Sequence, residues 1–298
     1  MHVCYNLPYM QSLQEYVSEA RSKGQAIGHF NACTVEMVWG IFRAAQKLSV
    51  PVIVGFSEGE RDFFGVRQAA LFVRSLREQY TYPIFSNADH TYSLQRVKEA
   101  VDALYDAVIF DGAELSFDEN LKITKQCVEY ARAHQSGTLV EGELGFIGKS
   151  SSVRAELPAG VHISEAYLTK PEEAARFVKE TGVDFLAPAV GNVHGMLANG
   201  HDPSLHIARV KAIRDAVAVP LVLHGASGNS AEDIAVACQA GVGIVHISTE
   251  LRVAYRRALQ VSLQSDPDQV APYKYLKPVV AAVEKIVEEK LAIVNKKL

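Results

Sequence analysis

The feature of the sequence that most constrains the fold is a regular alternation of short apolar runs with longer segments of helical spacing. The runs are rich in β-branched residues and occupy residues 26–32, 51–57, 83–89, 107–112, 138–144, 185–191, 220–226 and 243–249. Between them, apolar residues recur at i, i+3 and i+4, which is typical of amphipathic helices. Strands that alternate with helices predict a parallel sheet. Eight such units in this chain predict an α/β protein with a single (β/α)₈ barrel, the TIM barrel.

The length of 298 residues allows one or two domains. No linker divides the sequence, so we predict one domain over residues 1–298, with the barrel at about 24–265 and a helical tail at about 274–298. The tail has an apolar stripe that can pack on the barrel or on a partner subunit. Residues 145–170 lack periodicity and are rich in Gly, Ser and Pro, and we predict a mobile flap over the active site there.

The charge balance argues against strongly anionic partners. Lys and Arg number 30 against 34 Asp and Glu, a formal net charge of −4, whereas proteins that neutralise many phosphates have an excess of basic residues. We therefore expect no nucleic-acid partner. Cys4, Cys33, Cys127 and Cys238 form no close pair, and we expect free thiols in a reducing compartment. Without a signal-peptide pattern or a long apolar stretch, the sequence predicts a cytoplasmic protein with no membrane partner.

Polar residues gather at the ends of the predicted strands, where the active sites of barrels lie. The residues at these positions are Asn31, Ser57, Asp89, His90, Asp111, Glu141, Glu143, Asn192, His194, His224, His246, Ser248 and Thr249. His90, His194 and His224 follow strands three, six and seven, which a barrel brings to one mouth. Three imidazoles with an open fourth position are typical of catalytic Zn²⁺ sites. The arrangement indicates a catalytic metal, although each histidine alone can be a merely hydrogen-bonded one, because such wide spacing is less specific than a compact metal motif.

Motifs along almost the whole chain carry a family resemblance. They are GHFNACT, NADH, VIFDGAELSFDENL, VEGELGFIG, TKPEEAARFVKETGVDFLAPAVGNVHG, LHGASG and ISTELRVAY, each at or after a predicted strand. In this order they resemble the class II, zinc-dependent fructose-bisphosphate and tagatose-bisphosphate aldolases. The resemblance implies a Zn²⁺ cofactor and a phosphorylated sugar as substrate.

The resemblance also implies roles for individual residues. The zinc ligands would be His90, His194 and His224. Asp89 matches the catalytic aspartate that exchanges a proton with the C4 hydroxyl, and its alternative role is to orient a histidine ligand. Glu143, in the ELG motif, lies near the metal in this family, or is simply a buried carboxylate. The GGxED pattern of the flap is missing, and Glu156 is the nearest candidate for the catalytic flap glutamate, unless its side chain is simply solvated.

By the same resemblance, a further group of residues binds the substrate and its phosphates. It comprises Asn31, Ser57, Gly195, Gly225, Ser227, Gly228, Ser248, Thr249 and Arg252, with Ser57 and Arg252 at the far phosphate of a bisphosphate. Relatives have GGSG where this chain has GASG at residues 225–228, which keeps the serine of the phosphate cradle.

Three positions depart from the family pattern. Ala198 and Ile244 replace lysines, and His246 replaces an asparagine that touches the ketone. His246 can act as an acid/base, bind substrate or add a metal ligand, and we predict a catalytic role; packing at the barrel mouth is the alternative. These changes alter recognition of dihydroxyacetone phosphate more than zinc binding.

We therefore predict a zinc-dependent aldolase, a lyase that reversibly cleaves a phosphorylated ketose into a dihydroxyacetone-phosphate-like ketone and an aldehyde. Fructose 1,6-bisphosphate is not the first choice of substrate. One alternative is a zinc-dependent ketose isomerase or epimerase that uses the same enediolate, and another is a catalytically silent paralogue that acts as a partner subunit. The complete set of Asp89, His90, His194 and His224 argues against the silent paralogue. We expect a homo-oligomer, either a dimer or a tetramer.

Overall fold

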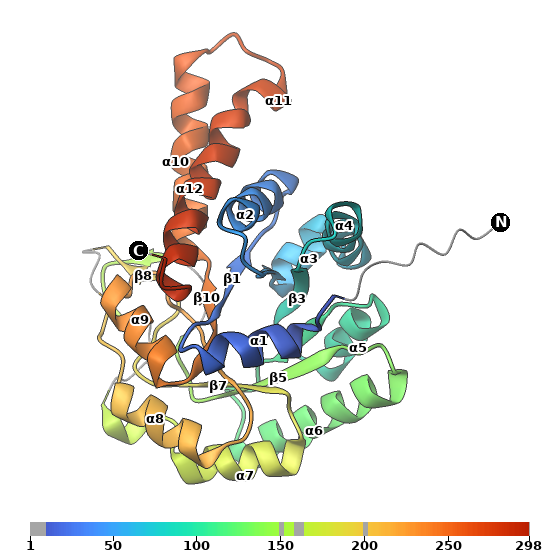
Figure 1. Ribbon diagram of the computed structural model, residues 1–298, viewed down its shortest axis with the longest axis vertical. Coiled ribbons are helices and arrows are strands. Elements are labelled where there is room, and N and C mark those ends of the chain that lie inside the picture. Colours follow the sequence, from blue (N-terminus) through green and yellow to red (C-terminus); the bar gives the residue numbers. More distant parts are fainter. Residues whose placement is uncertain (1–9, 149–151, 158–163, 199–201, 298) are drawn as a thin grey trace, which may run out of the picture.

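The computed structural model describes residues 10–148, 152–157, 164–198 and 202–297. Its centre is a closed barrel of parallel strands (Figure 1), in the order β1-β10-β9-β7-β5-β4-β3-β2. The strands are β1 (Ile27–Asn31), β2 (Val52–Phe56), β3 (Ile84–Thr91), β4 (Ala107–Phe110), β5 (Leu139–Leu144), β7 (Phe185–Pro188), β9 (Leu221–Leu223) and β10 (Val242–Ile247). The predicted (β/α)₈ barrel is confirmed, and each predicted apolar run overlaps one barrel strand.

Helices surround the barrel and extend beyond it. They are α1 (Leu13–Ser22), α2 (Val35–Leu48), α3 (Glu58–Phe64), α4 (Val66–Tyr80), α5 (Leu94–Asp102), α6 (Phe117–His134), α7 (Pro171–Thr181), α8 (Ile207–Ala216), α9 (Ala231–Ala240), α10 (Thr249–Ser265), α11 (Pro272–Tyr275) and α12 (Lys277–Val294). Side-chain caps begin α2, α5, α6 and α9, where each capping oxygen accepts the backbone N–H of the third helical residue. The capping residues are Thr34, Ser93, Ser116 and Ser230.

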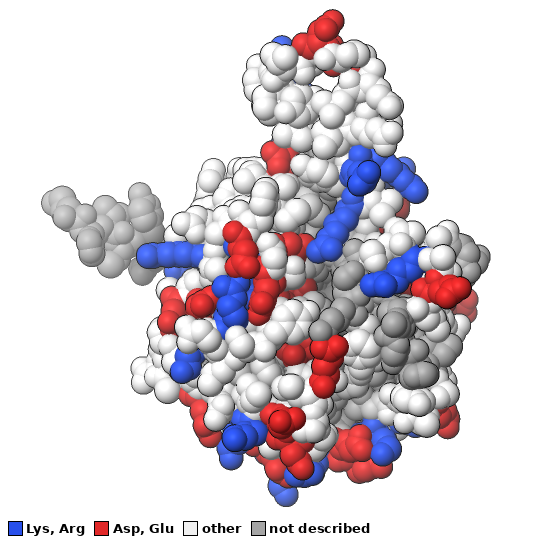
Figure 2. All heavy atoms as spheres, turned by 180° about the vertical axis from the view of Figure 1, so that it is seen from behind, with Lys and Arg blue, Asp and Glu red and all other residues white. Residues whose placement is uncertain are grey.

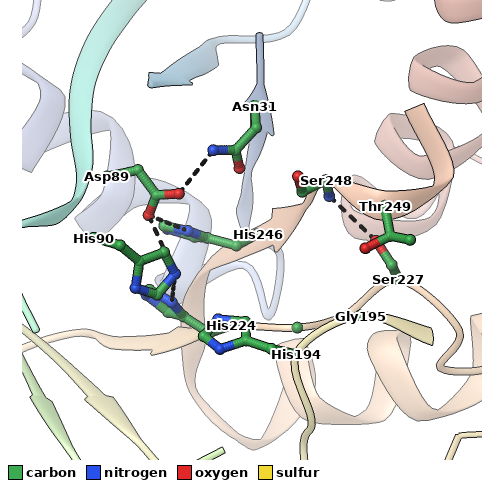
Figure 3. A pocket seen from close by; sticks show the side chains of 11 residues that line it. Asn31, Asp89, His90, His194, Gly195, His224, Ser227, His246, Ser248 and Thr249 are labelled. Carbon is green, nitrogen blue, oxygen red and sulfur yellow. Dashed lines mark hydrogen bonds and ion pairs between the residues drawn. The ribbon is translucent and has the colours of Figure 1, made fainter. Parts of the chain in front are cut away.

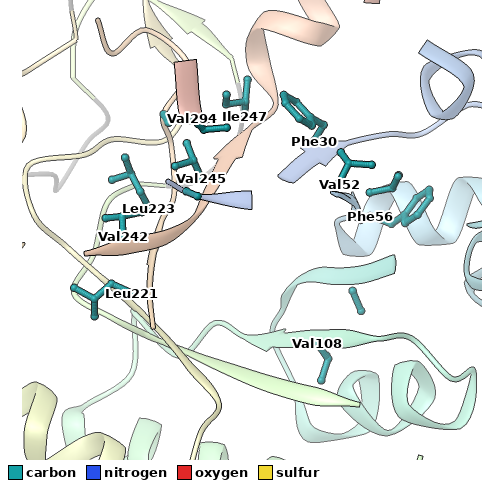
Figure 4. Close-up of a cluster of buried hydrophobic side chains, with 14 of the residues drawn as sticks. Phe30, Val52, Phe56, Val108, Leu221, Leu223, Val242, Val245, Ile247 and Val294 are labelled. Carbon is teal, nitrogen blue, oxygen red and sulfur yellow. The ribbon is translucent and has the colours of Figure 1, made fainter. Parts of the chain in front are cut away.

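The strand faces divide the core into two layers. Outward-facing residues such as Phe30, Val52 and Val245 pack against the helices in the larger cluster (Figure 4). The inner layer is smaller and joins Ile27, Ile53 and other residues near the strand beginnings to Leu13 and Val17 of α1. Helix α1 therefore closes the amino-terminal end of the barrel, a role that the sequence analysis did not predict.

The C-terminal helices form a hairpin that projects from the barrel (Figure 1), with α10 and α12 side by side and α11 near its tip. The base of α12 packs tightly on the barrel wall. A Cβ at Gly40 of α2 would lie 2.8 Å from Val283 Cγ1, and one at Gly28 of β1 would lie 2.8 Å from Leu291 Cδ2. Of the two predicted docking places for the tail, the structure therefore shows packing on the barrel.

The predicted flap is described only in part. Within it, η1 (Glu165–Tyr167) is a short 3₁₀ turn, and β6 (Val153–Arg154) pairs with β8 (Met196–Leu197) in a small parallel sheet beside the barrel. Residues 149–151 and 158–163 lie outside the described residues.

The surface charges, the cysteines and the apolar character of the helices bear on the expectations about partners and compartment. On the face in Figure 2, Lys and Arg alternate with Asp and Glu over most of the barrel, and a group of Lys and Arg side chains lies at the base of the projecting hairpin. Cys33, Cys127 and Cys238 are free thiols as predicted, while Cys4 lies outside the described residues. Among the described helices, none combines the length and apolar character needed to cross a bilayer.

Candidate active site

A pocket lies at the carboxyl ends of the barrel strands (Figure 3) and is lined by 11 residues. They are Asn31, Asp89, His90, His194, Gly195, His224, Gly225, Ser227, His246, Ser248 and Thr249. Every one of them belongs to the candidate residues identified from the sequence. The structure thus brings together the three predicted histidine ligands, two of the predicted catalytic residues and most of the predicted phosphate residues, whereas Glu143 and Gly228 lie outside this lining.

Two consecutive residues, Asp89 and His90, both face this pocket, which a regular strand forbids because successive side chains point to opposite faces. The pairing of β3 with β4 shifts between Ala88 and Thr91, and His90 has a φ of 39°. Such a bulge re-aims a side chain. A left-handed backbone at a non-glycine residue is strained, so surrounding contacts must hold it in place.

The side chain of Arg61, on α3, stabilises this bulge through hydrogen bonds. Its side chain is buried, with 1% of the residue exposed. The guanidinium donates to the carbonyl oxygens of Phe56 at 2.5 Å and Asp89 at 2.9 Å, and to Thr91 Oγ1 at 3.1 Å. Arg61 therefore contacts the residue on each side of His90, through the carbonyl of Asp89 and the hydroxyl of Thr91. The sequence analysis did not identify this residue.

Each predicted zinc ligand uses one ring nitrogen to bind a fixed acceptor. The pairs are His90 Nδ1 with Asp111 Oδ2 at 3.0 Å, His194 Nδ1 with the Gly148 carbonyl at 2.5 Å, and His224 Nε2 with Glu141 Oε1 at 2.7 Å. An acceptor partner places the proton on the bonded nitrogen and leaves the lone pair on the other. The lone pairs therefore lie on His90 Nε2, His194 Nε2 and His224 Nδ1.

The histidine nitrogens converge as a metal site requires. His90 Nε2 and His224 Nδ1 are 3.3 Å apart, and the candidate ligand atoms of the three histidines lie within 4.8 Å of one another. Three neutral imidazoles, each oriented by an acceptor, fit Zn²⁺ with one open coordination position. His90, Asp111 and Glu143 form a second group within the same distance limit, which keeps Glu143 as a candidate metal ligand.

The carboxylates around His90 control the charges in the pocket. Burial lowers the pKa of His90, but Asp89, Asp111 and Glu143 outweigh it and hold that pKa well above its usual value. Burial raises the pKa of Asp89, but His90 and His246 outweigh it and hold the pKa well below its usual value. Burial, reinforced by Asp111, raises the pKa of Glu143 to about 8. Asp89 is thus an ionised carboxylate at neutral pH. His90 and Glu143 readily hold a proton, which a metal ion bound at either side chain would have to displace.

Asn31 orients the Asp89 carboxylate. Its Nδ2 donates to Asp89 Oδ2 at 2.7 Å, whereas Asp89 Oδ1 has no hydrogen-bond partner within the described part of the chain. His246 Nδ1 lies 3.6 Å from Oδ1, too far for a good hydrogen bond. One carboxylate oxygen is therefore anchored and the other is available to accept a proton from a bound substrate.

A stack of three imidazoles extends from the metal site into the barrel. The His246 ring lies 4.1 Å from that of His224 and 3.5 Å from that of His29, with the His29 and His246 planes only 6° apart. Space for His29 exists because its neighbour is Gly55, where a Cβ would lie 2.1 Å from His29 Cε1. His29 was not among the residues predicted from the sequence. Its signal was the period of two in β1, which places Ile27, His29 and Asn31 on one face.

The other side of the pocket has the features of an anion site (Figure 3). Ser227, Ser248 and Thr249 gather where α10 begins, and Ser248 N donates to Ser227 Oγ at 3.2 Å. The first backbone N–H groups of a helix favour an anion. Gly225 has a φ of 63°, and a Cβ there would lie 2.2 Å from the Val193 carbonyl, so this loop requires glycine. The Gly228 amide already donates to Glu250 Oε1 at 3.2 Å.

Several expected residues do not line the pocket. Glu156 is exposed and Ile244 belongs to the inner apolar layer, below the residues that a substrate reaches. Ser57 and Arg252 are also outside the lining. Both instead bind Glu60, a residue that the sequence analysis did not identify.

Comparisons with known proteins agree with this geometry. The family model described as "Fructose-bisphosphate aldolase class-II" matches residues 11–297. A fructose-bisphosphate aldolase from Geobacillus stearothermophilus is 36% identical over 271 residues, 90% of each chain. The Escherichia coli K12 protein YdjI is 34% identical over 281 residues, 94% of each chain.

Solved structures give the same result. The crystal structure of the YdjI aldolase from Escherichia coli K12 superimposes with a TM-score of 0.79 and 32% identity, and covers 96% of this chain and 97% of that one. The match spans the barrel and the C-terminal helices together. The chain belongs to the class II fructose-bisphosphate aldolase family and is an aldolase, a carbon–carbon lyase.

Proposed function

We propose that this aldolase binds Zn²⁺ through His90, His194 and His224 and reversibly cleaves a phosphorylated ketose into a dihydroxyacetone-phosphate-like ketone and an aldehyde. The observation that carries the proposal is the orientation of the three histidines. Each has its second nitrogen fixed by an acceptor, while the remaining lone pairs meet beside Asp89. A hydrogen-bond acceptor at the second nitrogen of every histidine is typical of metal sites. Because the relatives are aldolases, we assign this site to catalysis.

The chemistry that a bound Zn²⁺ supplies is Lewis-acid polarisation of a substrate carbonyl oxygen. The residues of the chain supply the proton transfer. As the bond between C3 and C4 breaks, its electron pair moves toward the ketone carbonyl and Asp89 Oδ1 takes the proton of the C4 hydroxyl. Asn31 holds the other oxygen at 2.7 Å and so keeps the acceptor in place. Glu156 is exposed, so a role as flap acid requires residues 152–157 to approach the pocket.

The phosphate of the ketone portion belongs on the opposite side of the pocket. Ser227, Ser248 and Thr249 lie at the start of α10, and the glycines Gly195 and Gly225 line the same pocket. Ser248 Oγ is buried and has no hydrogen-bond partner among the described residues, so it can donate to a phosphate oxygen. The substrate is proposed to differ from fructose 1,6-bisphosphate, because His246 stands beside the metal where relatives carry asparagine.

Neither alternative activity is favoured by the relatives. An isomerase or epimerase keeps the same metal and proton acceptor and releases no aldehyde. A silent paralogue has no physical need for three oriented histidines. We also retain cytoplasmic location and a homo-oligomeric state as proposals.

The test is an activity screen of the purified protein against phosphorylated ketoses, with and without a zinc chelator. We expect one aldehyde and one ketone phosphate per substrate consumed, loss of turnover on chelation, and recovery on adding Zn²⁺. A product that is only an isomer of the substrate would favour the isomerase. Absence of turnover in the zinc-replete protein would favour the silent paralogue.

A further inference from the structure

A buried carboxylate stands beside the active site where an anionic substrate group would otherwise find its donors. Glu60 of α3 is 6% exposed. Its Oε1 accepts from Arg252 Nη2 at 2.5 Å, and its Oε2 accepts from Ser57 N at 2.8 Å and from Asn31 Nδ2 at 2.9 Å. The Glu60 carboxylate thus accepts hydrogen bonds from a guanidinium, a backbone amide and a side-chain amide.

Glu60 is linked through Asn31 to Asp89, the residue that we propose to accept the proton. A single nitrogen, Asn31 Nδ2, lies 2.7 Å from Asp89 Oδ2 and 2.9 Å from Glu60 Oε2. In Figure 3, the Asn31 amide points toward Asp89 and away from Ser227, Ser248 and Thr249, which lie together at the start of α10. A ketose with its phosphate at the serines therefore extends its other end toward Asn31 and Glu60.

At the end of the pocket near Asn31 and Glu60, the positive charge of Arg252 is already paired with the negative charge of Glu60. The cation of Arg252 is paired with Glu60 at 2.5 Å, and the pair is partly buried, which strengthens it relative to a pair in water. A phosphate placed there would have to compete with Glu60 for Ser57 N and Arg252. Because Glu60 is buried and held by three donors, moving it aside would break all three contacts, and a phosphate placed beside it would have to share the guanidinium of Arg252 with a second anion.

We infer that Glu60 excludes a phosphate from the far end of the substrate, so that the ketose cleaved is a monophosphate whose aldehyde portion carries uncharged hydroxyl groups. Glu60 is then a residue that determines specificity by repulsion as well as by occupying donors. This inference rests on the proposed aldolase function, and it concerns only the end of the substrate that lies away from the serines.

The first experiment compares two substrates on the wild-type zinc enzyme. We expect kcat/KM for fructose 1-phosphate to exceed that for fructose 1,6-bisphosphate by at least about tenfold, in line with the rejection of groups that meet an unmatched site. Equal or better cleavage of the bisphosphate would overturn the inference and leave the aldolase function intact. Cleavage of no phosphorylated ketose would overturn the proposed function and the inference with it.

The second experiment removes the charge at constant shape. Glu60→Gln should lower the preference for the monophosphate by at least about tenfold, because the amide removes the repulsion and releases Arg252 for the second phosphate. The matched control is Asp62→Asn, which removes a carboxylate from the same helix at a side chain that is 63% exposed, and which should leave the preference within twofold. An unchanged preference in a zinc-loaded Glu60→Gln protein would contradict the inference. Should that variant fail to fold, the wild-type comparison decides.

Discussion

At the scale of single residues, metal binding and proton transfer reside in different side chains and can therefore be separated by mutation. Asp89→Asn should lower kcat by about 10²-fold or more, as expected for loss of a general acid/base, while zinc content stays near that of the wild type. His224→Ala should instead lose most of the zinc. Metal analysis and steady-state kinetics on the same samples check both outcomes.

The two variants also differ in stability. His224→Ala leaves Glu141, which is fully buried, without its hydrogen-bond donor, and an unsatisfied buried acceptor costs about 1–3 kcal/mol. Asp89→Asn keeps an acceptor oxygen for Asn31 and should unfold close to the wild type. If Asp89→Asn lost zinc in proportion to activity, Asp89 would act as a metal ligand or as the orienter of a ligand.

A second prediction concerns the stacked rings of His29 and His246. His246→Asn should lower kcat/KM for the preferred ketose phosphate by about tenfold, because the ring between Asp89 and His224 is lost. His29→Ala should lower it less, since His29 acts only by supporting His246. In a double-mutant cycle the pair should show a coupling of about 0.5–1.5 kcal/mol, the range for ring contacts. Additive effects in zinc-loaded proteins would mean that the rings act independently.

The site residues that could be predicted from the sequence are those at the carboxyl ends of the strands, because these ends form the mouth of the barrel. His224 and Ser227 lie at the end of one run and His246 and Thr249 at the end of another, so the barrel rule alone places them in one pocket. Glu60 could not be found in this way. The spacing of Ser57 and Glu60 is that of a helix cap, and the burial of Glu60 depends on Arg252, which is 192 positions away in the sequence.

At the scale of elements, Arg61 of helix α3 holds the backbone bulge of strand β3 in place. Arg61→Met should reduce the free energy of unfolding by about 3 kcal/mol, because the buried carbonyls of Phe56 and Asp89 lose their donor. It should also weaken zinc binding about 10–100-fold, since the φ of His90 is no longer enforced. Denaturant unfolding and zinc titration measure the two effects.

The matched control for this element is Arg96→Met. Arg96 makes ion pairs with Asp62 and Glu99 on the outside of the molecule, and such pairs contribute about 0–1 kcal/mol. Zinc affinity should stay at the wild-type value in this variant. A zinc affinity of Arg61→Met equal to that of Arg96→Met would show that the bulge holds its shape without the buried arginine.

The strands were predictable because each is a short apolar run buried on both faces, as parallel strands require. The bulge at His90 and the closing helix α1 were not. A bulge changes no local composition, and α1 precedes the first repeat, so only the packing of Leu13 and Val17 against the strand beginnings defines its place.

At the scale of the whole molecule, the C-terminal hairpin leaves apolar residues without cover. Val270 is 87% exposed and Tyr273 is 69% exposed, and Val261 and Leu263 are exposed nearby. The outer part of the hairpin carries few charged side chains on the face in Figure 2. Its base is fixed, because α12 packs against Gly40 of α2 and Gly28 of β1, so the tip projects away from the barrel.

The last prediction follows from this arrangement. Exposed apolar residues on a rigid projection favour association, and identical chains associate most often through closed symmetric contacts. We expect the wild type to be a dimer or tetramer at micromolar concentration, and the double variant Val270→Asp with Tyr273→Asp to have a smaller mass by sedimentation velocity. The far-ultraviolet circular dichroism should not change, because both side chains are exposed. A wild-type monomer would contradict the prediction, and an unchanged mass in the variant would place the subunit contact on another part of the barrel.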